Sequence, residues 1–85
     1  MNKKLREYQR IWDKKADYLF QVAVWLFENK NNKHEYFDYP DYAGMPKKLS
    51  KKLSSYDTDC IQENWDSILA STRFAFIRDI MLKQV

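Results

Sequence analysis

The feature that most limits how this chain can fold is the segment 5–27, which ends in the apolar run from Tyr18 to Phe27. At a helical advance of about 100° per residue, its apolar side chains fall on one side and most of its charged side chains on the other. The apolar stripe comprises Leu5, Tyr8, Trp12, Ala16, Leu19, Phe20, Ala23, Leu26 and Phe27. The pattern predicts one long amphipathic helix over about residues 3–29, against which the rest of the chain folds.

A second apolar stripe lies on the flank of the first and comprises Ile11, Tyr18, Val22 and Trp25. A single helical partner covers only one stripe, so the second needs either another helix of this chain or another molecule. An uncovered aromatic stripe of this kind marks a binding surface. Residues 20–27 also alternate as a strand would. Helix is favoured, because the helical phase set by Leu5 continues through them without a breaker.

The segment 34–45 is rich in tyrosine and contains Pro40, which disfavours helix at the residue before it. We therefore expect an irregular connection between helices. Tyr36, Tyr39 and Tyr42 either pack across the helix ends or form an adhesive surface, since tyrosine offers a large rigid area with a polar tip.

A short second helix is predicted over about residues 46–55, because Pro46 suits the first turn of a helix. Leu49 and Leu53 would face the core. The opposite side would be one continuous basic face made of Lys47, Lys48, Lys51 and Lys52.

A third helix is predicted over about residues 59–83. Its candidate N-caps are Asp57, Thr58 and Asp59, and Gln62 has the spacing to form a capping box with Asp59. Its first half turns one side to the core, namely Ile61, Trp65, Ile68, Leu69, Thr72 and Phe76. In its second half the stripe rotates toward Phe74, Ile77, Ile80 and Met81. The predicted fold is a single all-α domain of three helices, in which two long antiparallel helices are crossed by the short basic one.

The composition limits the chemistry that the chain can carry out. There is one cysteine among 85 residues, so no intrachain disulfide can form and a reducing cytoplasm is the expected compartment. The longest apolar run, about ten residues, is too short to span a bilayer. The N-terminal residues are too charged for a signal peptide. With a single glycine, the chain has no glycine-rich phosphate loop.

Two local patterns resemble reactive sites and are rejected. His34 and Asp38 have the spacing of a zinc-binding helix, but a metalloprotease signature needs a second histidine and a third ligand. Cys60 is surrounded in sequence by acidic residues, which oppose a thiolate, so we interpret it as structural. We therefore predict no catalytic, cofactor-binding or metal-ligating residue, and no enzyme activity.

Two functions are compatible with this sequence. The first is binding of a protein partner, or of a second copy in a homodimer, as in small accessory or inhibitor proteins of mobile elements. The expected protein-binding residues are Ile11, Tyr18, Val22, Trp25, Tyr36, Tyr39, Tyr42, Phe74 and Met81. The alternative is a nucleic-acid-binding module that contacts phosphates. Its expected residues are Lys47, Lys48, Lys51, Lys52, Arg6, Arg10 and Lys14.

Overall fold

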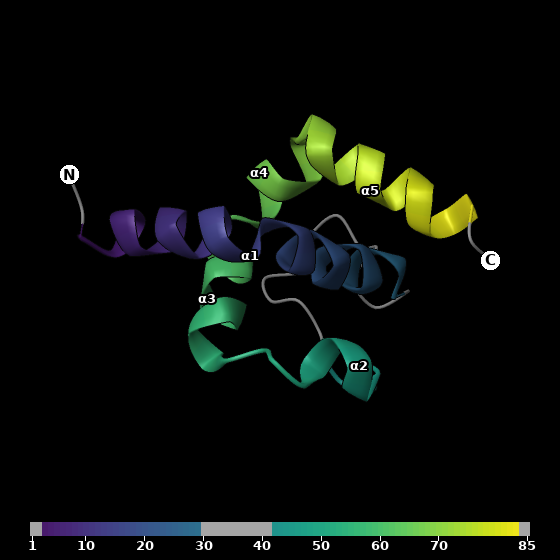
Figure 1. Ribbon diagram of the computed structural model, residues 1–85, viewed down its shortest axis with the longest axis horizontal. Coiled ribbons are helices and arrows are strands. Elements are labelled where there is room, and N and C mark those ends of the chain that lie inside the picture. The colour runs from purple at the N-terminus through teal and green to yellow at the C-terminus, as the bar shows by residue number, and fades with distance from the viewer. Residues whose placement is uncertain (1–2, 30–41, 84–85) are drawn as a thin grey trace.

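The computed structural model describes residues 3–29 and 42–83, and the regular secondary structure of these residues is entirely α-helical (Figure 1). The predicted all-α class is confirmed. The elements are α1 (Lys3–Glu28), α2 (Lys47–Ser50), α3 (Ser55–Glu63), α4 (Trp65–Ala70) and α5 (Thr72–Lys83).

α1 is the central element, with α5 along one side of it and α2 and α3 on the other (Figure 1). The core surrounds its second half, which is apolar in nearly every direction and is helical rather than a strand. A helix of this kind is stable only when neighbours cover all of its sides. The fully or almost fully buried core residues are Leu19, Phe20, Val22, Ala23, Val24, Leu26, Ile61, Trp65, Ile68 and Phe74.

α1 bends at Lys15, whose backbone angles (φ −121°, ψ 18°) are not helical. The helix contains neither proline nor glycine, the common causes of a kink. The bend allows the first half of α1 to pack on α3, where the rings of Tyr8 and Tyr56 are 5.2 Å apart. The first turn extends beyond α3 (Figure 1). Leu5, which the periodicity assigned to the core side, is therefore 43% exposed.

α3 begins four residues earlier than the predicted third helix. Ser54 is its N-cap: the Ser54 Oγ accepts the Asp57 N–H at 3.2 Å, and the Asp57 carboxylate accepts the Ser54 N–H at 3.1 Å. This reciprocal pair is a capping box with aspartate in place of glutamate. The prediction of a box formed by Asp59 and Gln62 is wrong, because Asp59 already lies inside the helix.

The single helix expected over residues 59–83 is divided into three, with breaks at Asn64 and Ser71. The Asn64 side chain donates to the Cys60 carbonyl at 2.8 Å and so satisfies the end of α3. Ser71 is extended (φ −78°, ψ 144°). Its hydroxyl donates to the Ile68 carbonyl at 2.8 Å and accepts the Phe74 N–H at 3.0 Å. After this turn α5 leads toward the same side of the molecule as the end of α1, instead of returning as one antiparallel rod (Figure 1).

α2 is much shorter than the helix expected over residues 46–55. It begins after Pro46, whose carbonyl accepts the N–H groups of Leu49 and Ser50 at 2.9 and 3.0 Å. The last residue of α2 is Ser50, so Lys51 and Lys52 lie in the turn that leads to α3. The four lysines therefore do not form the continuous helical face that the periodicity predicted.

Candidate functional site

A concave, mainly apolar groove with a volume of about 650 Å³ lies between α1, α2 and α5. Its apolar lining includes Leu49 and four side chains of α5, namely Phe76, Ile77, Ile80 and Met81. Its polar edge includes Asp17, Gln21 and Lys48. We call this surface the α5 groove.

Large apolar side chains of α5 are exposed at and beside this groove. Phe76 is 64% exposed, Ile80 is 41% exposed and Leu82 is 49% exposed. Phe76 and Ile80 are four residues apart, which places them next to each other on one side of the helix. Exposed apolar side chains gathered at a groove are typical of a binding site.

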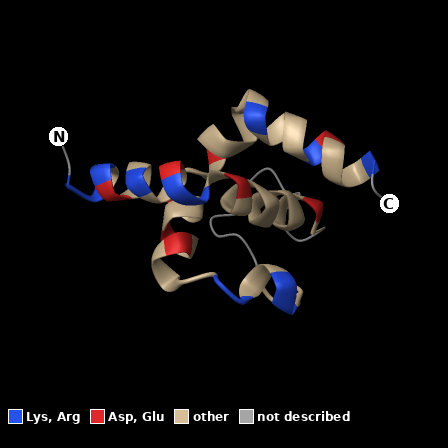
Figure 2. Cartoon of the chain, viewed as in Figure 1, with Lys and Arg blue, Asp and Glu red and all other residues tan. Residues whose placement is uncertain are grey.

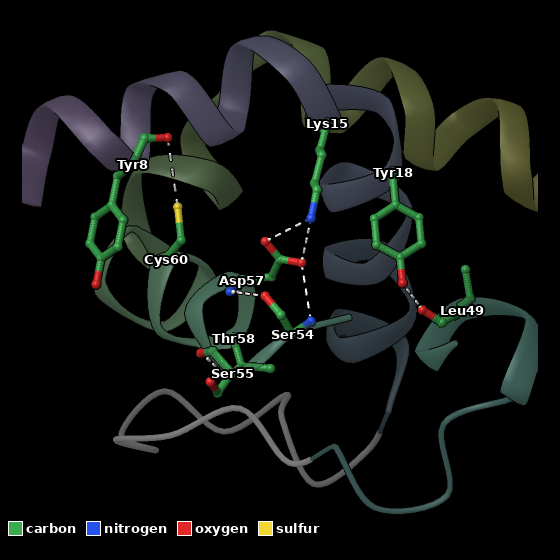
Figure 3. A network of polar contacts seen from close by, with 9 residues as sticks. All are labelled: Tyr8, Lys15, Tyr18, Leu49, Ser54, Ser55, Asp57, Thr58 and Cys60. Atoms are coloured by element: carbon green, nitrogen blue, oxygen red, sulfur yellow. Dashed lines mark hydrogen bonds and ion pairs between the residues drawn. The ribbon is translucent and has the colours of Figure 1, made fainter. Parts of the chain in front are cut away.

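A network of polar contacts holds α1, α2 and α3 together behind these surfaces (Figure 3). From the bend of α1, the Lys15 Nζ reaches the two carboxylate oxygens of Asp57 at 2.9 and 3.2 Å. Asp57 is only 1% exposed and also caps α3. The Tyr18 hydroxyl donates to the Leu49 carbonyl. This contact joins α2 to α1 and so positions Leu49 in the wall of the α5 groove.

The structure places the predicted protein-binding residues in different environments. Met81 lies in the α5 groove. Val22 and Phe74 are buried in the core, so the prediction that they present a binding surface is wrong. Val22 is enclosed because it belongs to the core cluster around the second half of α1, although the adjacent Gln21 is exposed. Phe74 turns inward because the helix restarts after Ser71, and its ring contacts Phe27 at 5.7 Å between centroids.

The other members of that set are half-buried or undescribed. Tyr42 donates its hydroxyl to the Thr58 carbonyl at 3.3 Å. Tyr36 and Tyr39 lie outside the described residues, as does His34. The remaining members of the set are half-buried and pack against the core. They are Ile11, Tyr18 and Trp25.

Sequence reasoning missed Phe76, which is the most exposed large apolar side chain among the described residues. In one unbroken helix Phe76 would share the core side of Ile61 and Trp65. The break at Ser71 resets the helical phase, which turns Phe74 inward and Phe76 outward. The rotation of the apolar stripe within residues 59–83 was the sequence signal that could have revealed the break at Ser71 and the exposure of Phe76.

The predicted nucleic-acid-binding residues are all exposed, and the structure brings some of them together. One hollow, of about 530 Å³, is lined by Lys14 of α1, Lys52 of the turn before α3, and Arg73 of α5. A second hollow, of about 250 Å³, is lined by Arg10 and Tyr56 and shares Lys14 with the first. Figure 2 shows the basic residues along the first half of α1, on α2 and in the turn that follows it. The predicted residues that line neither hollow are Arg6, Lys47, Lys48 and Lys51.

Cys60 is fully buried, and burial raises the pKa of its thiol from about 9 to about 11. Such a thiol is neutral at neutral pH and is a poor nucleophile. Across residues 3–29 and 42–83, no cluster of three or more His, Cys, Asp or Glu residues could hold a metal ion. Within the same described ranges, no helix is both long and apolar enough to cross a bilayer.

Comparisons of the chain with protein-family models, with curated protein sequences and with solved structures found no match.

Proposed function

We propose that this protein is a non-enzymatic interaction protein whose α5 groove binds an amphipathic helix of a protein partner. The observation that carries the proposal is the exposure of Phe76 and Ile80 on the wall of a groove formed by three helices. An apolar groove between helices is the shape that accepts the apolar face of another helix, whose anchors recur every three or four residues.

The charges around the groove indicate an acidic partner helix. Residues 42–56 contain four lysines and no acidic residue. Lys48 lies on the edge of the groove, and Lys47 next to it is exposed. Asp17, which also lines the groove, forms an ion pair with Arg73. Glutamate or aspartate flanking the apolar anchors of the partner would therefore face lysines, which favours association and its orientation.

A second copy of this chain fits the groove less well than an acidic helix does. The most exposed apolar helix that a second copy could insert is α5 itself. α5 carries three basic residues, Arg73, Arg78 and Lys83, against one acidic residue, Asp79. Insertion of α5 would bring this net positive charge against the lysines of α2, and such like-charge contacts are unfavourable.

The proposal is tested by selecting binders from a display library of helical peptides with randomised faces. We expect the enriched peptides to combine large apolar residues at helical spacing with flanking Glu or Asp. Phe76→Ser should weaken their binding by roughly 30-fold, the effect of losing an interface anchor. The matched control is Leu5→Ser, which removes another exposed apolar side chain at the far end of α1 and should leave binding unchanged.

Other outcomes of this selection would overturn the proposal. Peptides that lose affinity equally in the two variants do not use the groove. Enrichment of basic peptides would contradict the charge argument. A stable dimer of the free protein that Phe76→Ser dissociates would show that the groove holds a second copy instead.

A further inference from the structure

We propose that the surface around Lys14 and Lys52 binds the phosphodiester backbone of double-stranded DNA without reading its sequence. This surface adjoins the α5 groove at Asp17 and consists of the two hollows, which share Lys14 and Lys15. The proposal does not depend on the partner of the groove.

The first argument is the convergence of basic side chains from distant parts of the chain. The bend in α1 and the turn before α3 bring Lys14 and Lys52 to one hollow, although 38 positions separate them. Along α1, Arg6, Arg10 and Lys14 follow one another at steps of four residues, and each step advances about 6 Å. Within the part of the chain that the structure describes, the exposed basic side chains of this surface that form no ion pair are Arg6, Arg10, Lys14 and Lys52. Lys15 and Arg73 also line the first hollow, and each forms an ion pair. A row of cations of this kind can replace the counterions of a phosphate backbone.

The second argument is that three acidic side chains near the hollows are already bound to other side chains. Asp57 is buried beneath Lys15 and bound to it. Asp17 is paired with Arg73, and Glu7 accepts a hydrogen bond from the Tyr56 hydroxyl at 2.8 Å. The two hollows are lined by five basic residues and three acidic ones, and the surface keeps a net positive charge when the buried Asp57 is counted against Lys15. The basic residues are Arg10, Lys14, Lys15, Lys52 and Arg73, and the acidic residues are Glu7, Asp13 and Asp17.

The aromatic residues of this surface favour a duplex over a single strand. Single-strand binding depends on exposed rings on which unpaired bases stack. Tyr18 and Tyr56 are half-buried here, and their hydroxyls donate to the Leu49 carbonyl and to Glu7. The exposed groups include the ends of lysine and arginine side chains, which contact phosphates and carry no base recognition by themselves. The carboxylates of Asp13 and Asp17 are exposed beside them.

The experiment measures the fluorescence anisotropy of a labelled duplex of about 20 base pairs with the 85-residue chain. We expect binding at about 50 mM salt and a loss of roughly 100-fold in affinity at about 200 mM, as for about four phosphate contacts. The double variant Lys14→Gln/Lys52→Gln should weaken binding at least roughly 10-fold and reduce the salt slope by about two. Both side chains are exposed, so the variant should keep the helical circular-dichroism spectrum of the wild type.

The matched control is Lys3→Gln/Lys83→Gln, which changes the net charge equally through exposed lysines outside the two hollows. It should bind the duplex within about twofold of the wild type, because charges that lie farther from the duplex than the Debye length are largely screened in the salt range of this assay. Phe76→Ala should bind the duplex as the wild type does, which separates this surface from the groove. The proposal is overturned by absence of duplex binding at low salt, by equal losses in the two lysine doubles, or by binding only to phosphatidylserine vesicles.

Discussion

Asp57 links α1 to α3 through its buried carboxylate. Its carboxylate is almost completely buried, yet it accepts hydrogen bonds from Lys15 and from the Ser54 backbone. A buried charge is tolerated only when it is paired and hydrogen-bonded. The bend of α1 lies at Lys15, so one ion pair joins the bend to the first turn of α3.

We expect Lys15→Met to lower the free energy of unfolding by about 1–3 kcal/mol, because the Asp57 carboxylate would stay buried without its counterion. The expected decrease in the free energy of unfolding lies at the lower end of the range for buried ion pairs, because Lys15 is half-exposed and water can reach the site. Urea denaturation followed by circular dichroism measures the change. Lys14→Met, at the neighbouring exposed lysine, should change stability by no more than about 0.5 kcal/mol. Equal effects of the two variants would show that the ion pair contributes nothing.

Cys60 gives the protein a dependence on alkaline pH. Burial raises the pKa of its thiol from about 9 in the unfolded chain to about 11 in the folded protein. The unfolded chain therefore loses this proton first, and the associated stability is complete below about pH 9 and is lost as the pH rises toward about 11. The slope reaches at most about 1.4 kcal/mol per pH unit. Denaturation between these pH values should show a smaller slope for Cys60→Ala than for the wild type, and identical slopes would contradict the assignment.

At the scale of the elements, one long helix is covered by several short ones. α3, α4 and α5 have nine, six and twelve residues, and helices of this length are marginal in isolation. Their ends are therefore fixed by side chains, with Ser54 before α3, Asn64 after it and Ser71 before α5. The turn at Ser71 decides which side of α5 faces the core, and so it exposes Phe76.

Ser71→Ala should lower the free energy of unfolding by about 1 kcal/mol, because the Phe74 N–H and the Ile68 carbonyl lose their shared hydroxyl partner. Ser67→Ala, at an exposed position inside α4, should stay within about 0.5 kcal/mol of the wild type. Thermal or urea denaturation distinguishes the two. A stabilised Ser71→Ala variant would mean that α4 and α5 readily join into one helix.

The long apolar period of α1 could be predicted from the sequence, because it continues over many residues. The breaks at Asn64 and Ser71 could not, because a capping side chain and a solvent-facing one look alike until the local backbone is known. The same holds for the candidate site. Met81 was expected at a binding surface, whereas Phe76 depends on the phase of α5 and was missed. The meeting of Lys14 and Lys52 depends on a bend and a turn that no periodicity indicates.

At the scale of the whole molecule, two surfaces of different chemistry adjoin. Asp17 lines both the α5 groove and the larger basic hollow, so ligands on the two surfaces would be neighbours. The bend of α1 lies at Lys15, within the larger basic hollow. Its first half carries most of the basic residues of the helix, and its second half forms the core that supports α5.

The free protein should be a monomer, because α5 carries a net positive charge and the groove of a second copy has Lys48 on its edge, with the exposed Lys47 next to it. Size-exclusion chromatography with light scattering should give the mass of one chain, 10.4 kDa. A mass of twice that value at low micromolar concentration would restore the homodimer that the apolar stripes of the sequence first indicated.

The most direct test of the central claim is a nuclear magnetic resonance titration with two synthetic helical peptides that share one apolar stripe. One peptide carries glutamates beside the stripe and the other carries lysines. The acidic peptide should shift the signals of Phe76, Ile80, Met81 and Leu49, both in the wild type and in Leu5→Ser. At the same peptide concentration the shifts of the remaining groove residues should be much smaller in Phe76→Ser. The claim is contradicted if the basic peptide binds equally well, or if the shifts lie outside the groove.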